Sequence, residues 1–207
     1  MTRKEQILNK ALELINEKGF VHVGVREIAR ELKISPGNLS YHFGKKEDVL
    51  MALLERYREA NTSLYETYLA TPPSLKGFLH LMKSIFESQY LYRGVFIGNQ
   101  YVQAQLESGD HFNYQEIYER RLAGFARIFK ELHTAGHLKL SEEDVRFLVF
   151  HMTLAGRFWI YEATLFDKSP DRDSTVKHYL WMLSKQLSLF ATETGRQSIG
   201  AFTAELE

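Results

Sequence analysis

The side chains best suited to chemistry in this chain lie between Gly37 and His42. Around Leu39 this stretch offers a small residue, an amide, a hydroxyl, a phenol and an imidazole, at Gly37, Asn38, Ser40, Tyr41 and His42. Such groups donate and accept hydrogen bonds, and the base edges in the major groove of DNA present distinct donor and acceptor patterns. The stretch is therefore typical of a surface that contacts a DNA duplex.

Two short helices are expected to position these side chains. The first has apolar residues at the spacing of one helix face, at Val25, Ile28, Ala29 and Leu32. The second, over about 36–42, begins at Ser35-Pro36, a capping hydroxyl followed by proline at the first helical position, and it turns Leu39 and Phe43 inward. The pair, joined by Lys33-Ile34-Ser35, predicts a helix-turn-helix whose second helix enters the major groove.

Composition limits the other function classes. The net charge is zero, and the cation excess within residues 20–46 is modest, so charge alone also fits a solvated surface. The chain has no cysteine, which excludes disulfides, Cys-ligated zinc and thiol catalysis. His133 and His137 have i, i+4 spacing, but Gly136 indicates a helix end and no Glu follows the first His. We expect no enzyme and no metal or cofactor site.

Helical spacing of apolar residues continues along the chain and predicts an all-α fold. A first helix opens at the capping box Thr2-x-x-Glu5. Later helices are expected over about 44–70, 74–92, 97–107, 112–135, 141–166 and 172–194, the last capped by Asp173-Ser174-Thr175. With no apolar run near the roughly 20 residues that span a bilayer and no apolar signal core, the chain is expected in the cytoplasm and off the membrane.

The break at Thr71-Pro72-Pro73-Ser74 predicts a domain boundary. We expect a DNA-binding domain over 1–48 with a linking helix to about 70, a second domain over 71–195, and a C-terminal tail over 196–207.

Residues 61–207 hold 23 of the 27 aromatic residues, a content that suits either simple core packing or a cavity for an apolar or aromatic small molecule. The candidate ligand-binding residues lie on aromatic stripes or are polar groups among apolar neighbours: Phe86, Gln89, Tyr90, Gln103, Tyr118, Phe125, His151 and Arg157. Arg157 either faces such a pocket, where it would favour a carboxylate, or pairs with an acid across a dimer.

The N-terminal residues resemble the TetR (tetracycline repressor) family over roughly residues 5–56. The resemblance rests on Arg26-x-Ile28-Ala29, on Ile34-Ser35-x-Gly37-x-Leu39-x-x-His42-Phe43 and on Lys46-x-x-Val49-Leu50. The chain departs from the family pattern at Ser40, where tyrosine is usual, and at Gly24, where a capping threonine is usual.

This resemblance implies a TetR-like fold of about nine helices: a three-helix DNA-binding domain, then a helical domain for effector binding and dimerisation. It implies a homodimer on a near-palindromic DNA operator, released by a small-molecule effector. The implied DNA contacts come from both short helices and from the start of the next, at Arg26, Ser35, Gly37, Asn38, Ser40, Tyr41, His42 and Lys46. The implied dimer interface comes from the last two long helices, at Leu148, Met152, Ala155, Trp159, Tyr179, Leu183 and Leu187.

Alternatives remain open at this stage. Lys46 is also compatible with a solvated charge, Tyr41 with packing against the fourth helix, and His42 with a position at the core edge. Arg26 is also compatible with an ion pair to Glu27 or Glu31. A constitutive DNA-binding regulator, whose second domain serves only dimerisation, remains the alternative function.

Overall fold

The computed structural model describes residues 1–97, 114–167 and 170–206. Within these ranges every regular element is a helix, apart from an isolated antiparallel bridge between Leu138 and Ala191. The chain divides into two compact units. Unit 1 contains Met1–Thr62 and Ser88–Ser108, and unit 2 contains Ser63–Glu87 and Gly109–Glu207. The all-α prediction is confirmed, whereas the helix expected near 97–107 lies outside the described residues.

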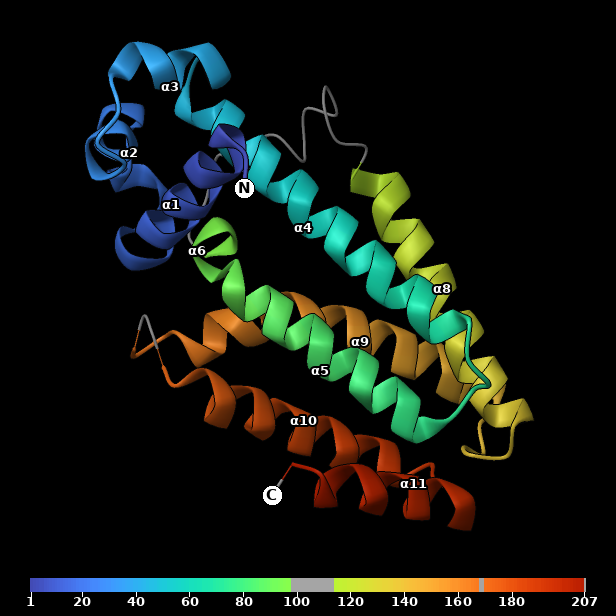
Figure 1. Cartoon of the computed structure of the whole chain (residues 1–207). Coiled ribbons are helices and arrows are strands. Elements are labelled where there is room, and N and C mark those ends of the chain that lie inside the picture. Colours follow the sequence, from blue (N-terminus) through green and yellow to red (C-terminus); the bar gives the residue numbers. More distant parts are fainter. Residues whose placement is uncertain (98–113, 168–169, 207) are drawn as a thin grey trace. The chain divides into compact units, whose positions relative to one another are not determined.

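Unit 1 is built from the N-terminal helices, the first part of α4 and the end of α5 with α6 (Figure 1). The bounds are α1 Arg3–Lys18, a 3-10 turn Phe20–His22, α2 Val25–Glu31, α3 Pro36–His42, α4 Lys46–Leu69, α5 Leu75–Leu91 and α6 Arg93–Phe96.

Local sequence explains where these helices begin. Thr2 and Glu5 form the predicted capping box, because each side chain binds the backbone N–H of the other residue. The Ser35 hydroxyl accepts a hydrogen bond from the Asn38 amide, and Pro36 occupies the first turn of α3. Gly24 provides no side-chain cap for α2.

Apolar residues of α1, α3 and α4 form the core of this unit, and Ile7, Ala11, Leu39, Leu50 and Leu53 have no exposed surface.

Unit 2 consists of the remainder of α4 and α5 and of four later helices. Their bounds are α8 Tyr114–Thr134, α9 Glu142–Ala163, α10 Arg172–Ser188 and α11 Glu193–Ala204. The largest fully buried side chains here are Phe78, Phe129 and Phe202. α9 and α10 run antiparallel, because Glu162 near the end of α9 contacts Tyr179, whereas His151, earlier in α9, contacts Gln186, later in α10. Among the described residues, no helix combines the length and apolar character needed to cross a bilayer.

The C-terminal region differs from the prediction. The helix expected over 172–194 ends at Ser188, and the expected tail is instead α11, which begins after the cap Thr192. The first turn of α11 lies close to His137, because a Cβ at Gly195 would lie 2.1 Å from the His137 carbonyl oxygen and only glycine permits so close an approach. The cap of α10 is Asp171, which accepts from the Ser174 amide, and not the predicted Asp173-Ser174-Thr175.

Candidate functional site

The corner between α2 and α3 presents one side of α3 to solvent. Lys33 adopts a left-handed φ of 53° and thereby turns the chain between the two helices. Leu39 is fully buried and Phe43 is 5% exposed, so both anchor α3 on the core as the spacing predicts. The residues on either side of Leu39 face outward. Gly37, Asn38 and Ser40 are exposed, and the Tyr41 side chain is 86% exposed. The predicted polar surface therefore exists as a continuous outer side of α3.

Arg26 lies exposed near the start of α2. The carboxylates that were its alternative partners are engaged elsewhere, because Lys18 binds Glu27 at 2.7 Å and Arg30 lies 3.5 Å from Glu31. The hydrogen bond from Lys18 holds the pKa of Glu27 below its usual value. Arg26 makes no ion pair with any residue that the structure describes, so its guanidinium is available to an external anion.

Lys46 and His42 are both partly buried, unlike the rest of the predicted contact surface. The Lys46 ammonium lies 3.5 Å from the Val21 carbonyl oxygen and 4.7 Å from the centre of the Phe20 ring. The His42 ring meets the Tyr41 ring edge-on, with the centroids 5.2 Å apart. Lys46 therefore already has intramolecular partners, and Tyr41 does not pack against α4 as the alternative proposed.

A chain of aromatic rings runs through the core of unit 2. Neighbouring ring centres are 5.6 to 6.4 Å apart along the sequence of contacts Tyr65, Phe125, Phe129, Phe78 and Tyr68. Phe86, another predicted ligand-binding residue, is buried, and the centre of its ring lies 4.9 Å from that of Trp159. Phe86 and Phe125 are thus packed core residues in this structure.

The polar candidates are dispersed. His151 Nδ1 lies 2.7 Å from the Gln186 side-chain nitrogen, and the Arg157 guanidinium lies 5.6 Å from the centre of the Tyr118 ring. Both pairs belong to unit 2. Gln89 and Tyr90 belong to unit 1, and Gln103 lies outside the described residues.

Tyr68 is a polar group that sequence patterns did not single out. Its side chain is buried at the end of the aromatic chain, and its hydroxyl has no hydrogen-bond partner among the described residues. Burial, with the nearby Glu131 charge, raises the pKa of Tyr68 to about 12. The hydroxyl therefore stays protonated and is a free hydrogen-bonding group inside unit 2.

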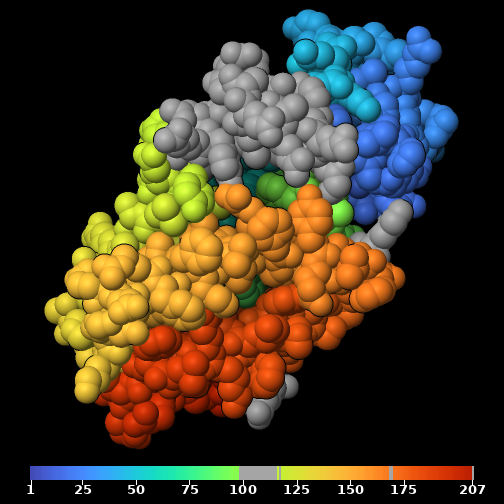
Figure 2. All heavy atoms as spheres, turned by 180° about the vertical axis from the view of Figure 1, so that it is seen from behind, coloured from blue at the N-terminus to red at the C-terminus, as the bar shows by residue number. Residues whose placement is uncertain are grey.

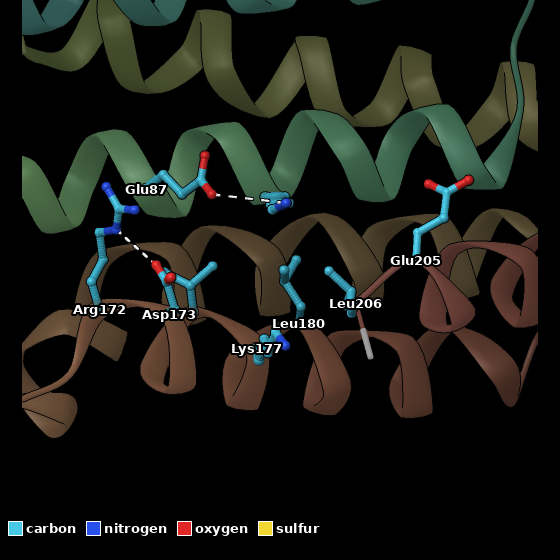
Figure 3. Close-up of a pocket in the computed structure, with 9 residues that line it drawn as sticks. Glu87, Arg172, Asp173, Lys177, Leu180, Glu205 and Leu206 are labelled. Atoms are coloured by element: carbon cyan, nitrogen blue, oxygen red, sulfur yellow. Dashed lines mark hydrogen bonds and ion pairs between the residues drawn. The ribbon is translucent and has the colours of Figure 1, made fainter.

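A surface hollow of about 450 Å³ lies among α5, α10 and the end of α11 (Figure 3). Its lining includes the ion pairs Arg172–Asp173 at 3.0 Å and Lys83–Glu87 at 4.0 Å, above an apolar floor that includes Leu180. None of the predicted ligand-binding residues that the structure describes lines it. Of the residues that the structure describes, no group of three or more His, Asp or Glu side chains is arranged to hold a metal ion.

An apolar face is exposed on α9 and α10, which appear as neighbouring bands in Figure 2. We call it the α9–α10 face; it consists of Phe147, Phe150, Leu154 and Phe158 on α9 and Trp181 and Met182 on α10, each about half exposed or more. The α9 members recur at i, i+3, i+7 and i+11, so they share one side of the helix.

This face differs from the predicted dimer interface. Most of the predicted residues are buried inside the chain itself and are not available to a partner: Leu148, Met152, Trp159, Leu183 and Leu187. Ala155 is exposed and Tyr179 is partly exposed. α9 has apolar residues on two sides. Most of the residues predicted from the sequence for the dimer interface lie on the side that packs inward.

Comparison with known protein families finds matches to two consecutive parts of the chain. Residues 7–53 match the family described as "Bacterial regulatory proteins, tetR family", and residues 56–199 match "Bacterial transcriptional repressor" of the TetR type. Together these matches cover most of the chain.

Curated relatives are transcriptional regulators. HTH-type transcriptional regulator HbdR of Aromatoleum sp. (strain CIB) is 29% identical over 93 residues, which are 45% of this chain and 38% of HbdR. Transcriptional regulator AcuR of Cereibacter sphaeroides is 25% identical over 165 residues, 75% of this chain and 71% of AcuR. The chain thus matches less than half of the length of HbdR.

Solved structures share the fold. A TetR-family transcriptional regulator from Marinobacter aquaeolei VT8 superposes with a TM-score of 0.83 at 25% identity and full coverage of both chains. The ketosteroid transcriptional regulator KstR2 of Mycobacterium tuberculosis superposes with a TM-score of 0.66 at 18% identity, covering 93% of this chain and 96% of KstR2.

Proposed function

Because this chain belongs to the TetR family of bacterial transcriptional regulators, we propose that it is a ligand-responsive repressor. It binds a near-palindromic DNA operator as a homodimer and releases the operator when a small, largely apolar or aromatic effector binds. The observation that carries the proposal is the outer side of α3, where Gly37, Asn38 and Tyr41 are exposed while Leu39 anchors the helix.

DNA binding follows from the geometry of helix-turn-helix proteins. The second helix of such a pair lies in the major groove, and the first crosses the DNA backbone. α3 therefore contacts base edges, and the exposed Arg26 of α2 contacts a phosphate. Phosphate contacts position the protein and make affinity depend on salt, while base contacts select the sequence.

The α9–α10 face is the proposed dimer interface, and its occupant is a second copy of the chain. Contiguous exposed apolar surface marks interaction sites in proteins. Two antiparallel helix pairs meeting across a twofold axis form a four-helix interface in which the same residues face each other. The axis sets two α3 helices about one DNA turn apart, roughly 34–36 Å.

Effector binding shifts the dimer between forms that match and do not match successive major grooves. Moving such an equilibrium from 99:1 to 1:99 takes about 5.5 kcal/mol of differential affinity, which two identical sites share. The aromatic core of unit 2 supports an apolar or aromatic effector, and the unpaired Tyr68 hydroxyl supplies a hydrogen-bonding group for it. The protein acts in the cytoplasm, where its operator lies.

Two variants with the same added charge test DNA binding. Ser40→Glu places a carboxylate on the outer side of α3 and is expected to abolish binding to the operator. Ala60→Glu adds it at an exposed position of α4 and is expected to leave binding intact. Gel shift with the DNA upstream of its own gene, at several salt concentrations, gives the measurement. Wild-type protein that shows no salt-dependent binding to this DNA or to any genomic fragment overturns the proposal.

A thermal-shift screen against fatty acids, hydrophobic metabolites and dyes tests the sensor. A ligand at 100 times its Kd stabilises the protein by about 2.7 kcal/mol, and a true effector then lowers operator affinity in the gel shift. A dimer that binds its operator but responds to no compound in either assay is the constitutive regulator named above.

A further inference from the structure

The outer side of α3 has an unusual chemical composition for a base-reading surface. Its seven residues, Pro36 to His42, contain no Lys, Arg, Asp or Glu. Guanine is most often read by a bidentate Arg or Lys, and cytosine by Asp or Glu, which accept from its amino group. The side chains that usually select a G·C pair are therefore missing from this helix.

Asn38 is the one residue of α3 with a side-chain amide. An amide donates and accepts at once, and it fits the N6 and N7 atoms of adenine in a bidentate pair. The Asn38 backbone N–H binds the Ser35 hydroxyl at 3.1 Å, which holds the residue in place. Its side chain is exposed and makes no hydrogen bond to any residue that the structure describes. The amide is therefore positioned and free to bind a base.

Tyr41 lies beside Asn38 on the helix, because residues at i and i+3 are surface neighbours. Its ring is 86% exposed and offers apolar surface, which suits the methyl group that thymine carries in the major groove. The imidazole of His42 is partly buried behind the Tyr41 ring. Asn38 and Tyr41 thus form an exposed pair of neighbouring side chains on α3.

The nearby cations lie on other elements. Arg26 is on α2, the helix that crosses the backbone in such motifs. The Lys46 ammonium, on α4, already contacts the Phe20 ring and the Val21 carbonyl oxygen. Neither replaces an α3 residue as a reader of guanine at the base pair that faces Asn38.

We propose that Asn38 selects adenine, so that each operator half-site contains an A·T pair opposite Asn38 with thymine contacted by Tyr41. This inference rests on the proposed DNA-binding function and specifies the sequence class that it recognises. The dimer axis repeats the pair in both half-sites.

Selection from a randomised duplex library with the full-length protein tests the inference. Wild-type protein is expected to select an A·T pair at symmetric positions of both half-sites. Asn38→Ala is expected to lose the preference at that pair alone and to bind the selected site about 5- to 150-fold more weakly, the loss of one bidentate contact. Since the Asn38 side chain is exposed, the variant keeps its fold, which circular dichroism checks.

Lys45→Ala is the matched control, because it removes an exposed side chain outside α3 and is expected to leave every base preference intact. A selected site in which Asn38→Ala relaxes a G·C pair, or relaxes nothing, overturns the adenine assignment while the DNA-binding function stands. Wild-type protein that enriches no sequence at all overturns both.

Discussion

The side chain of Asn16 holds the backbone of Gly94, 78 residues further along the chain. The Gly94 amide donates to Asn16 Oδ1 at 2.8 Å, and Asn16 Nδ2 donates to the Leu91 carbonyl oxygen at 2.7 Å. One amide group thus joins α1 to the end of α5 and the start of α6. A further link comes from Arg56, which binds both Asn9 and the Tyr92 hydroxyl. These contacts make the α5–α6 corner part of unit 1.

Gly94→Ala is expected to destabilise the protein by about 1–3 kcal/mol, the usual cost of overpacking. The added Cβ would lie 2.4 Å from the Ile15 carbonyl oxygen, and backbone cannot move aside as a side chain can. Urea unfolding measures the change. Gly124→Ala in α8 is the control, because a Cβ there meets nothing within 4 Å and replaces a poor helix former. Equal stability of the two variants would contradict the tight α1–α6 contact.

Lys46→Ala is expected to weaken operator binding for all sequences and to lower the slope of log K against log salt by about 1, the contribution of one phosphate. To bind a phosphate, the Lys46 ammonium must leave its contacts with the Phe20 ring and the Val21 carbonyl oxygen. Binding measured between low and moderate salt gives the slope. An unchanged slope would mean that the ammonium stays with its intramolecular partners and contacts no DNA.

Phe150→Asp is expected to convert the proposed dimer to a monomer while leaving the monomer folded. Phe150 is 63% exposed in the single chain, so the charge costs little until a partner buries it. Light scattering after size exclusion gives the mass. Leu69→Asp, the same chemical change at an exposed position of α4, should remain dimeric. A dimeric Phe150→Asp variant would remove the α9–α10 face from the interface.

Phe125→Ala is expected to cost ~3–5 kcal/mol, because the ring is buried against Phe129 and Tyr65 and its removal leaves a cavity. Phe166→Ala, which removes the same ring where it is 95% exposed, should change the free energy of unfolding by less than about 0.5 kcal/mol. Chemical denaturation compares the two. A small loss at Phe125 would indicate an open pocket around it rather than packed core.

Tyr68→Phe is expected to leave the protein equally stable at neutral pH or to stabilise it by about 1 kcal/mol, because the lost hydroxyl is buried without a partner among the residues that the structure describes. The folded-state pKa of about 12 lies above the unfolded value, so Tyr68 favours folding below about pH 10 relative to higher pH. As pH rises from about 10 towards 12, wild type therefore loses stability that the variant keeps.

Denaturation midpoints across that range, with the tyrosinate absorbance of wild type minus variant, test the Tyr68 prediction. A neutral-pH loss of more than about 1 kcal/mol in Tyr68→Phe would show that the hydroxyl does have a hydrogen-bond partner. A tyrosinate difference that appears near pH 10 would show that Tyr68 is accessible to water.

Local sequence determined much of this structure, because capping and helical spacing act over a few residues. Thr2-x-x-Glu5 and Ser35-Pro36 start helices where the pattern predicts, and Ser141 with Asp144 forms a second full capping box at the start of α9. The outer side of α3 was equally predictable. Leu39 and Phe43 are the only large apolar residues there that can reach a core, so the polar residues must face outward.

Tertiary structure decided what local patterns leave undetermined. α9 is apolar on two sides, and only packing within unit 2 shows that Leu148 lies inside while Phe150 lies outside. Gly195 of α11 packs closely on the His137 backbone, and Gly94 of α6 is bound by Asn16 of α1. In each case the deciding partner is distant in sequence, and helical periodicity carries no information about residues more than a few turns away.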